Sequence, residues 1–180
     1  YVTATAFWTD IEDRIARLKN NRVDEDATKR NLHDGYIYGV ELLAEVDLAG
    51  GFSAYNGVAW SRGSERTYYD RFVTEPGADR PISRVPPLHG TFALKWRSPD
   101  RSFWAEASLD WSRKQKRLTD AEESDNRFPP DGSPAWQCYN LRGGWHATDN
   151  LSLSLAVENI TDAQYRVHGS GVNEPGRNVV

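Results

Sequence analysis

Apolar and polar residues alternate with a period of two along most of the chain, which is the pattern of β-strands with two different faces. The clearest run is 150–158, where leucine or valine at every second position alternates with serine or alanine. The pattern predicts eight strands, at 1–9, 35–48, 51–62, 88–98, 102–114, 135–147, 150–158 and one that starts near 175.

The connections between these strands alternate between long and short. Tight turns are expected at 49–51, 98–101 and 148–150. Long polar segments are expected at 10–34, 63–87, 115–134 and 159–174, with a short helical turn at 10–18. A soluble sandwich has no reason to place every long loop at one end, whereas an outer-membrane barrel has short periplasmic turns and long outer loops. The sequence therefore predicts an all-β fold: part of an antiparallel, up-and-down transmembrane β-barrel.

One face of the predicted strands is apolar, and the other is polar or charged. The polar face carries Glu41, Glu45, Asp47, Lys95, Arg97, Glu106, Asp110, Arg142 and His146. Such charges are costly against lipid but not in a wet lumen. Five tryptophans lie near predicted strand ends, where membrane interfaces favour aromatic rings: Trp8, Trp60, Trp96, Trp111 and Trp145. The alternatives are an ordinary sheet with one face in solvent and a soluble, tryptophan-rich carbohydrate-binding module.

The composition fits an extended fold better than a globular core. The 180 residues suffice for one domain, and only 38% of them are hydrophobic, yet 7 Trp, 8 Tyr and 6 Phe are present. The net charge of −4 gives no reason to expect a nucleic-acid partner. Because the sequence has no methionine and no signal peptide, we expect a processed chain or a fragment. The single cysteine, Cys138, cannot form an internal disulfide.

Several segments resemble TonB-dependent outer-membrane receptors. VENITD at 157–162, YR at 165–166 and HGSG at 168–171 resemble the penultimate-strand motif of that family, and NEPGRN at 173–178 resembles the start of its final strand. Further matches follow in the family's order: YGVE at 38–41, WSRG at 60–63, VPPLHG at 85–90, FWAE at 103–106 and GSPAW at 132–136. Each motif is weak alone, but together they cover nearly the whole chain.

The resemblance implies a function, and it implies which part of a longer receptor the chain represents. The family barrel has about 22 strands around a plugged lumen, and neither a plug nor a TonB-contacting box is recognisable in this sequence. We therefore expect residues 1–180 to be the C-terminal portion of a receptor barrel, cut at both ends. The implied function is TonB-dependent uptake, across the Gram-negative outer membrane, of a ferric siderophore, haem or another metal chelate. The partners would be outer-membrane lipid, the chelate and, only through the missing plug, TonB. A passive porin-like or structural barrel is the alternative.

The motif residues are expected to shape the rim of the barrel rather than to catalyse. They are Asn159, Asp162, Tyr165, Arg166, Gly169, Gly171, Gly176 and Arg177. Asparagine and aspartate bond local backbone where a strand leaves its ladder, tyrosine suits the interface, and glycine permits positive φ.

No catalytic motif, cofactor site or metal site is expected. The sequence contains no GxSxG, HExxH, GxxxxGK[ST] or CxxC pattern. The four histidines lie on separate elements without ligand spacing: His33, His89, His146 and His168. We expect His33 and His168 to face solvent in outer loops, with contact to a metal chelate as the alternative. Glu41 and Glu45 lie about 13 Å apart along one strand face, which is too far for paired acid–base catalysis.

A basic run follows the fifth predicted strand, at Arg113, Lys114, Lys116 and Arg117. It could contact anionic lipopolysaccharide or an anionic chelate. We favour a solvated loop, because four acidic neighbours are expected to offset the charge: Asp120, Glu122, Glu123 and Asp125.

Overall fold

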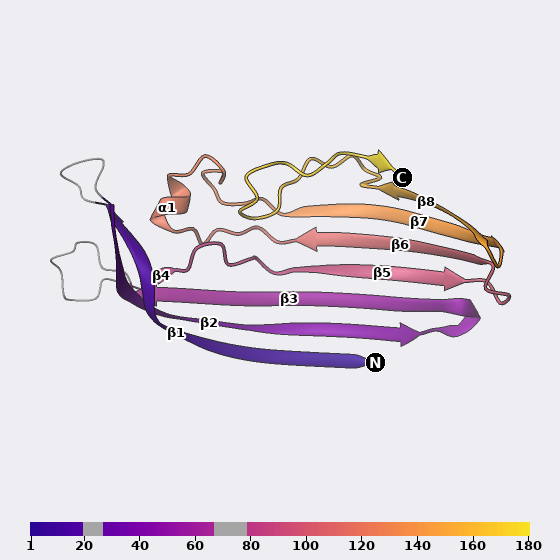
Figure 1. Ribbon diagram of the computed structural model, residues 1–180, viewed down its shortest axis with the longest axis horizontal. Coiled ribbons are helices and arrows are strands. Elements are labelled where there is room, and N and C mark those ends of the chain that lie inside the picture. Colours follow the sequence, from indigo (N-terminus) through magenta and orange to yellow (C-terminus); the bar gives the residue numbers. More distant parts are fainter. Residues whose placement is uncertain (20–26, 67–78) are drawn as a thin grey trace.

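The computed structural model describes residues 1–19, 27–66 and 79–180, and these form one antiparallel sheet (Figure 1). The strands are β1 (Val2–Lys19), β2 (Ala27–Asp47), β3 (Phe52–Arg66), β4 (Asp79–Pro81), β5 (His89–Arg97), β6 (Phe103–Ser112), β7 (Trp136–Thr148), β8 (Leu151–Glu158) and β9 (Asn178–Val179). The two helical turns are η1 (Ala49–Gly51) and α1 (Asp120–Glu123). Within the described residues, no helix is long and apolar enough to span a bilayer.

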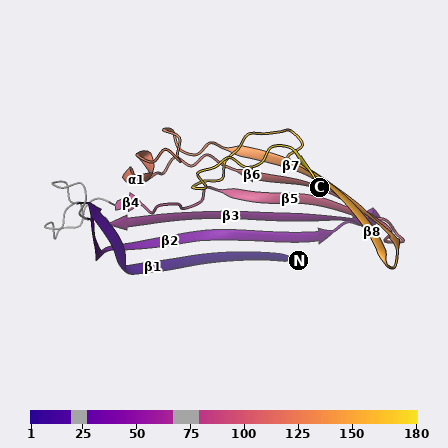
Figure 2. The same ribbon diagram turned by 45° about the horizontal axis from the view of Figure 1, so that its top comes forward.

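The strand order is that of an unclosed up-and-down barrel. It runs β1-β2-β3-β5-β6-β7-β8-β9, every neighbouring pair is antiparallel, and the short β4 pairs with β3 beside this path. A view turned by 45° shows the strands as one continuous layer (Figure 2). This confirms the predicted all-β, antiparallel, partial-barrel fold.

The short connections lie at one end of the sheet and the longer segments at the other (Figure 1). The predicted tight turns at 49–51, 98–101 and 148–150 are confirmed. In the middle turn, the carboxylate of Asp100 accepts hydrogen bonds from the hydroxyls of Ser98 at 2.6 Å and Ser102 at 2.7 Å. These hydrogen bonds, with that of Ser98 strongest, lower the pKa of Asp100 to about 2.

The first hairpin differs from the prediction. Residues 10–18 belong to β1 and do not form a helical turn, and β2 begins eight residues earlier than expected, at Ala27. The two strands stay paired with register shifts around Arg14, and Asp13 has a φ of 52°. Apolar and polar residues must alternate only where one face of a strand is apolar. The polar extension of this hairpin therefore shows no period-two pattern in the sequence. Residues 20–26 and 67–78 of the predicted loops lie outside the described part.

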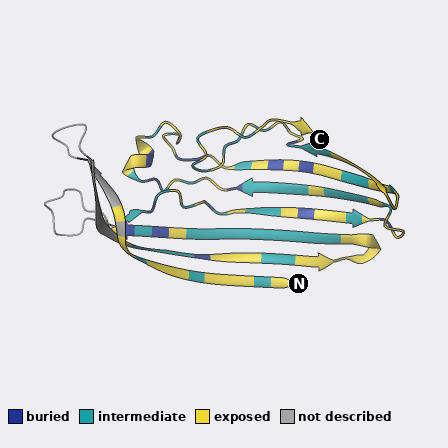
Figure 3. Cartoon of the chain, viewed as in Figure 1, coloured by how far each residue is buried: buried dark blue, intermediate teal, exposed yellow. Residues whose placement is uncertain are grey.

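The register places nearly all the exposed apolar side chains of the strands on one face, which we call the outer face. Leu153 and Leu155 are 54% and 60% exposed although they lie within a ladder. The other exposed members are Val2, Trp8, Val40, Leu42, Val46, Phe52, Phe92, Leu94, Phe103, Tyr139, Leu141, Trp145 and Leu151. A soluble sheet with one wet face would expose its polar side instead. Exposed residues occur on nearly every strand, most continuously on β1 and β2 (Figure 3), and exposed apolar side chains along a strand are expected for a surface that contacts hydrocarbon.

The opposite, inner face carries the predicted charges, and several of them pair. Glu106 lies 3.5 Å from Lys95 and 3.9 Å from Arg142, and Arg142 reaches Glu158 at 2.8 Å. This chain of ion pairs crosses the inner face from Lys95 on β5 to Glu158 at the end of β8. It neutralises charges that a wet interior can also solvate.

Aromatic side chains bound the apolar outer face in two bands. Toward the long loops, Trp8 stacks on Tyr36 at 5.0 Å and Tyr38 at 5.4 Å, and Tyr38 contacts Trp60 edge-on at 5.6 Å. Toward the short turns, Phe103 stacks on Trp145 at 5.9 Å. On β3, Trp60 and Phe52 are separated by about 26 Å along the strand, comparable with the ~25 Å apolar band of membrane barrels.

Candidate functional site

The motif at the end of β8 is centred on Asn159, which is buried. Its φ of 51° is left-handed, a conformation that asparagine tolerates better than most residues. Its side-chain amide donates to the carbonyls of Ala163 at 2.9 Å and Pro175 at 3.1 Å, and its Oδ1 accepts from the N–H of Ala163 at 2.9 Å. Asn159 therefore turns the chain out of the ladder and joins the outgoing segment to the returning one.

Asp162 ties the two segments together a second time. Its Oδ1 accepts a hydrogen bond from the backbone N–H of Arg177 at 2.8 Å, and the Nε of Arg177 donates to the carbonyl of Ile160 at 2.9 Å. Gly176 lies between them, where a Cβ atom would come within 2.6 Å of Asp162 Oδ1. Four of the eight motif residues thus form one cluster: Asn159, Asp162, Gly176 and Arg177.

The remaining motif residues lie farther along the loop. The Tyr165 ring lies 4.5 Å from Trp136, and burial followed by a hydrogen bond with Cys138 raises the pKa of Tyr165 to about 12. Arg166 donates to Asn173 Oδ1 at 3.0 Å and to the Arg127 carbonyl at 3.1 Å. The last two motif residues, Gly169 and Gly171, have φ values of 79° and 78°. Tyr165 thus contacts the start of β7, Arg166 joins loop segments, and the rim role remains a prediction.

A polar network leads from the motif onto the inner face. The backbone N–H of Asn159 donates to Asn140 Oδ1 at 2.9 Å, and the amide of Asn140 donates to Asp110 at 3.0 Å. Asp110 also accepts from the hydroxyl of Thr91 at 2.6 Å. Cys138, which is buried, lies 3.5 Å from the same Asn140 oxygen. The network connects β5, β6 and β7 with the residue that follows β8, below the loops.

A second loop cluster surrounds Glu122 in α1. Its Oε1 accepts from the hydroxyl of Ser83 at 2.9 Å and the N–H of Arg84 at 2.8 Å. Its Oε2 accepts from the N–H of Thr119 at 2.9 Å, which closes a capping box. Burial alone would raise the pKa of Glu122, but the hydrogen bonds from Thr119, Arg84 and Ser83 together hold it below its ordinary value. Glu122 therefore fastens the segment after β4 to the loop after β6.

Two of the histidines, His89 and His168, line the same cavity, described below. The His33 side chain lies outside the described part. His89 Nδ1 lies 2.8 Å from the Pro87 carbonyl, and His146 Nδ1 lies 2.8 Å from Ser152 Oγ. The expectation of a solvent-facing His168 is wrong, because its ring packs edge-on against Phe128 at 5.2 Å and bonds Ser133 Oγ at 2.8 Å. Burial lowers the pKa of His168, and Glu122 opposes that shift only in part. Among the described residues, no cluster of potential metal ligands exists.

A cavity of about 800 Å³ lies on the inner face, toward the long loops. One wall is a single cross-strand row: Thr5, Glu41, Ala59, His89, Ser112 and Trp136. Tyr165 and His168 reach the cavity from the loop above β8. Three carboxylates line it, from Glu41, Asp110 and Glu174, while no described lysine or arginine does. Its size is that of a small-molecule site.

The basic run is not offset as expected. Asp120 pairs with Arg80 at 3.0 Å, and Asp125 pairs with Arg127. Glu122 serves the loop cluster described above. Asp120, Glu122 and Asp125 therefore bond to groups outside the basic run. The prediction that they offset its charge is wrong.

Residues 1–160 match the family model described as TonB dependent receptor-like, beta-barrel. The chain belongs to the TonB-dependent receptor β-barrel family. Members of this family are outer-membrane transporters of Gram-negative bacteria rather than enzymes. No curated protein sequence matches the chain.

Solved TonB-dependent receptor structures share the fold. The copper transporter OprC superposes with a TM-score of 0.74 at 23% identity, covering 98% of this chain and 26% of OprC. The FrpB iron transporter from Neisseria meningitidis gives 0.74 at 21%, covering 99% of this chain and 28% of FrpB. The ferric enterobactin receptor PfeA from Pseudomonas aeruginosa, as a mutant, gives 0.68 at 18%, covering 99% and 28%. The chain thus spans about a quarter of the length of these receptors.

Within this TonB-dependent receptor barrel, sequence reasoning found the motif but missed the inner cavity and the Glu122 cluster. The sequence signal for the cluster was the spacing of Thr119 and Glu122, which is that of a capping box. The cavity had no comparable signal, because its wall combines residues from six strands.

Proposed function

We propose that residues 1–180 are the C-terminal portion of the barrel domain of an outer-membrane receptor for TonB-dependent uptake of a metal chelate. A ferric siderophore, haem or a similar complex is the cargo class. The observation that carries the proposal is the family match over residues 1–160, because a receptor barrel is the transport element of this family. The named structural neighbours include iron and copper transporters and a ferric enterobactin receptor, which supports a metal complex as cargo.

The inner cavity supports a further restriction on the cargo. It combines three carboxylates with aromatic faces from Trp136, Tyr165 and Tyr55, and no described cation lines it. Carboxylates and aromatic faces both attract positive charge and repel a dense anion. This part of the wall therefore favours contact with neutral or positively charged groups of the cargo.

A passive porin-like barrel is the second candidate, and energy dependence separates the two. The reading frame that contains this chain would be deleted in its host, and uptake of haemin, ferric enterobactin and copper(II) would be compared with that of the parent strain. We expect uptake of one complex to fall to background, and to fall equally when TonB is deleted. Uptake that persists without TonB would support the porin-like alternative, and unchanged uptake of every complex would contradict a role in metal acquisition.

The location is tested separately. Membranes of the same strain would be separated by density, and the intact receptor followed with an antibody to the loop at 159–177. We expect the receptor in the outer-membrane fraction. Recovery in the soluble fraction would contradict the proposal and would favour a soluble carbohydrate-binding sheet.

A further inference from the structure

Four basic side chains line one hollow of about 220 Å³ between β3 and the segments that flank β5 and β6: Arg62, Arg113, Lys114 and Arg117. Arg62, Arg113 and Lys114 are exposed and Arg117 is half-buried. Trp60 and residues 85–88 supply the apolar part of its lining. The uptake proposed above makes no use of this hollow, because the cavity for the chelate lies on the inner face.

The register places Arg62 on the outer face. Val40, which belongs to that face, pairs with Trp60, and Arg62 follows two residues later opposite Tyr38. Arg117 joins it there, because its Nη2 donates to the hydroxyl of Ser64 at 3.3 Å, and Ser64 follows Arg62 by two residues. Both guanidinium groups thus lie on the same side of the sheet as the exposed leucines.

The aromatic band of the outer face indicates how deep the two arginines lie relative to the membrane. The band consists of Trp8, Tyr36, Tyr38 and Trp60. The ring centroid of Trp8 lies 5.0 Å from that of Tyr36 and 5.4 Å from that of Tyr38, and the centroid of Trp60 lies 5.6 Å from that of Tyr38. Aromatic bands lie at the level of lipid headgroups. In the outer-membrane orientation proposed above, Arg62 and Arg117 lie just beyond the hydrocarbon, at the depth of the lipid phosphates.

The positive charge of this hollow is not neutralised by the described protein. None of its four basic residues makes an ion pair with a carboxylate in the described part of the chain. Three of the four acidic residues that follow the basic run, Asp120, Glu122 and Asp125, bond to Arg80, Ser83, Arg84 and Arg127 instead. Burial, and next the neighbouring charge of Arg62, lower the pKa of Arg117, although a guanidinium remains protonated.

We propose that this hollow is a binding site for the phosphate groups of an anionic lipid in the outer leaflet. A guanidinium offers two parallel N–H donors that match phosphate oxygens, and two arginines side by side suit a doubly charged headgroup. The apolar outer face below Trp60 accommodates the acyl chains of the same lipid. A soluble anionic chelate is a poorer occupant, because Arg62 and Arg117 lie on the outer face, whereas the carboxylate-lined cavity lies on the inner face. The proposal rests on the outer-membrane orientation proposed above.

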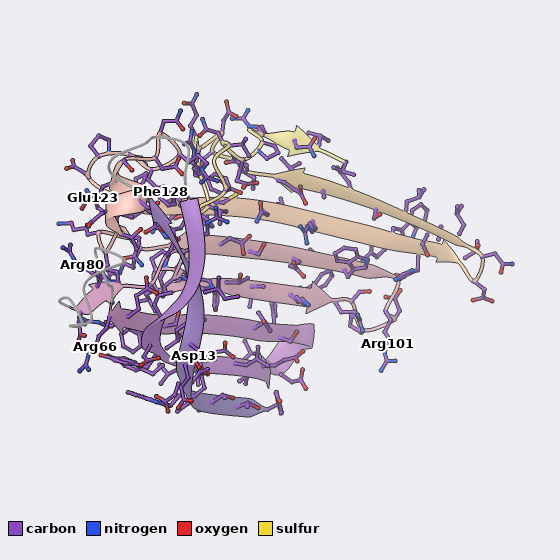
Figure 4. The ribbon with its side chains drawn as sticks, turned by 60° about the vertical axis from the view of Figure 1, so that its left-hand side comes forward. Asp13, Arg66, Arg80, Arg101, Glu123 and Phe128 are labelled. Carbon is purple, nitrogen blue, oxygen red and sulfur yellow. The ribbon has the colours of Figure 1, made fainter. Side chains whose placement is uncertain are left out.

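The test uses the intact receptor, purified in a zwitterionic detergent, with bound lipid measured by native mass spectrometry. The probes are diphosphoryl lipid A, monophosphoryl lipid A and inorganic phosphate. The variants are Arg62→Gln/Arg117→Gln and the charge-conserving Arg62→Lys/Arg117→Lys. The matched control removes two charges at the opposite end of the sheet, in Arg97→Gln/Arg101→Gln; Arg101 lies far from Arg66 and Arg80 (Figure 4).

We expect the double glutamine variant to bind diphosphoryl lipid A at least about tenfold more weakly, because each basic residue contributes to attraction at an anionic surface. The lysine variant should bind more tightly than the glutamine variant but more weakly than the parent, because it keeps the charge and loses the paired N–H donors. The control should bind like the parent. Equal binding by the glutamine variant, or an equal loss in the control, would overturn the proposal. Competition by inorganic phosphate at equal concentration would also overturn it in favour of a free-anion site. The lipid-binding measurement does not depend on transport. The lipid site can therefore be refuted while the uptake proposal stands, and the uptake proposal can be refuted while the lipid site stands.

Discussion

The backbone N–H of Asn159 donates to the side-chain oxygen of Asn140, 2.9 Å away on the neighbouring strand. This bond lies where β8 stops pairing with β7, since the next N–H, that of Ile160, donates to the Tyr139 carbonyl at 2.8 Å. Asn140 therefore continues the ladder with its side chain for one residue after regular pairing ends. Two asparagines therefore define the end of the strand. The side chain of Asn140 bonds the N–H of Asn159, and the side chain of Asn159 bonds the backbone of Ala163 and Pro175.

Replacing Asn159 by alanine should destabilise the barrel at this strand end. The change removes three side-chain hydrogen bonds and leaves a left-handed backbone without the side chain that supports it. We expect a loss of about 2–3 kcal/mol, measured as the free energy of urea-induced unfolding of the intact receptor in detergent micelles. Asn150→Ala, in an exposed turn at the opposite end, is the control and should change little. Equal stability of the two variants would show that the motif asparagine is dispensable.

The strands that cross the apolar band could be predicted closely, whereas the strand extensions could not. The expected strand at 88–98 is observed as His89–Arg97, and that at 150–158 as Leu151–Glu158. In this band the lipid on one side and the wet interior on the other enforce strict alternation. Beyond it both faces of a hairpin contact water, so the polar half of β1 carries no such signal.

The motif residues could be selected from the sequence, but their partners could not. Asp162 and Gly176 form one cluster because a glycine alone fits beside the carboxylate, and this contact joins residues far apart in the sequence. The bond between Ser83 and Glu122 joins residues 39 positions apart. No local sequence pattern encodes either pairing. The inner cavity and the Glu122 cluster could therefore be recognised only in the folded structure.

A charge on the outer face should prevent insertion, whereas the same charge one residue away should be tolerated. Leu155→Arg places a guanidinium against hydrocarbon on the membrane side of the Phe103–Trp145 pair, where the cost rises toward the roughly 2–4 kcal/mol of the bilayer centre. Ser154→Arg, its neighbour on the inner face, meets water. The yield of heat-modifiable, folded receptor in the outer membrane is the measurement. If both variants assembled equally, the division into lipid-facing and inner sides would be wrong.

Acid should release the loops that Glu122 fastens. The folded pKa of Glu122 lies below its ordinary value of 4.5, so its stabilisation is complete above that pH and is lost as the pH falls through the lower, folded value. Limited proteolysis of the intact receptor should therefore cut the loop after β6 faster as the pH falls below about 4.5. Glu122→Gln should be cut quickly even at pH 7, while Glu123→Gln, at an exposed neighbour, should behave like the parent. A pH-independent cutting pattern in the parent would contradict this role.

Charge reversal at the inner cavity should reduce uptake more than the same reversal outside it. Glu41 lines the cavity, and Glu45 lies four residues closer to the short turns on the same face of β2, outside the lining of this cavity. If the cargo is neutral or cationic, Glu41→Lys should lower its uptake by about tenfold, because a lysine replaces an attractive charge with a repulsive one. Glu45→Lys carries the same charge change and should lower uptake far less. The measurement is the initial rate of uptake of whichever complex the deletion strain fails to import, and faster uptake by Glu41→Lys would identify an anionic cargo.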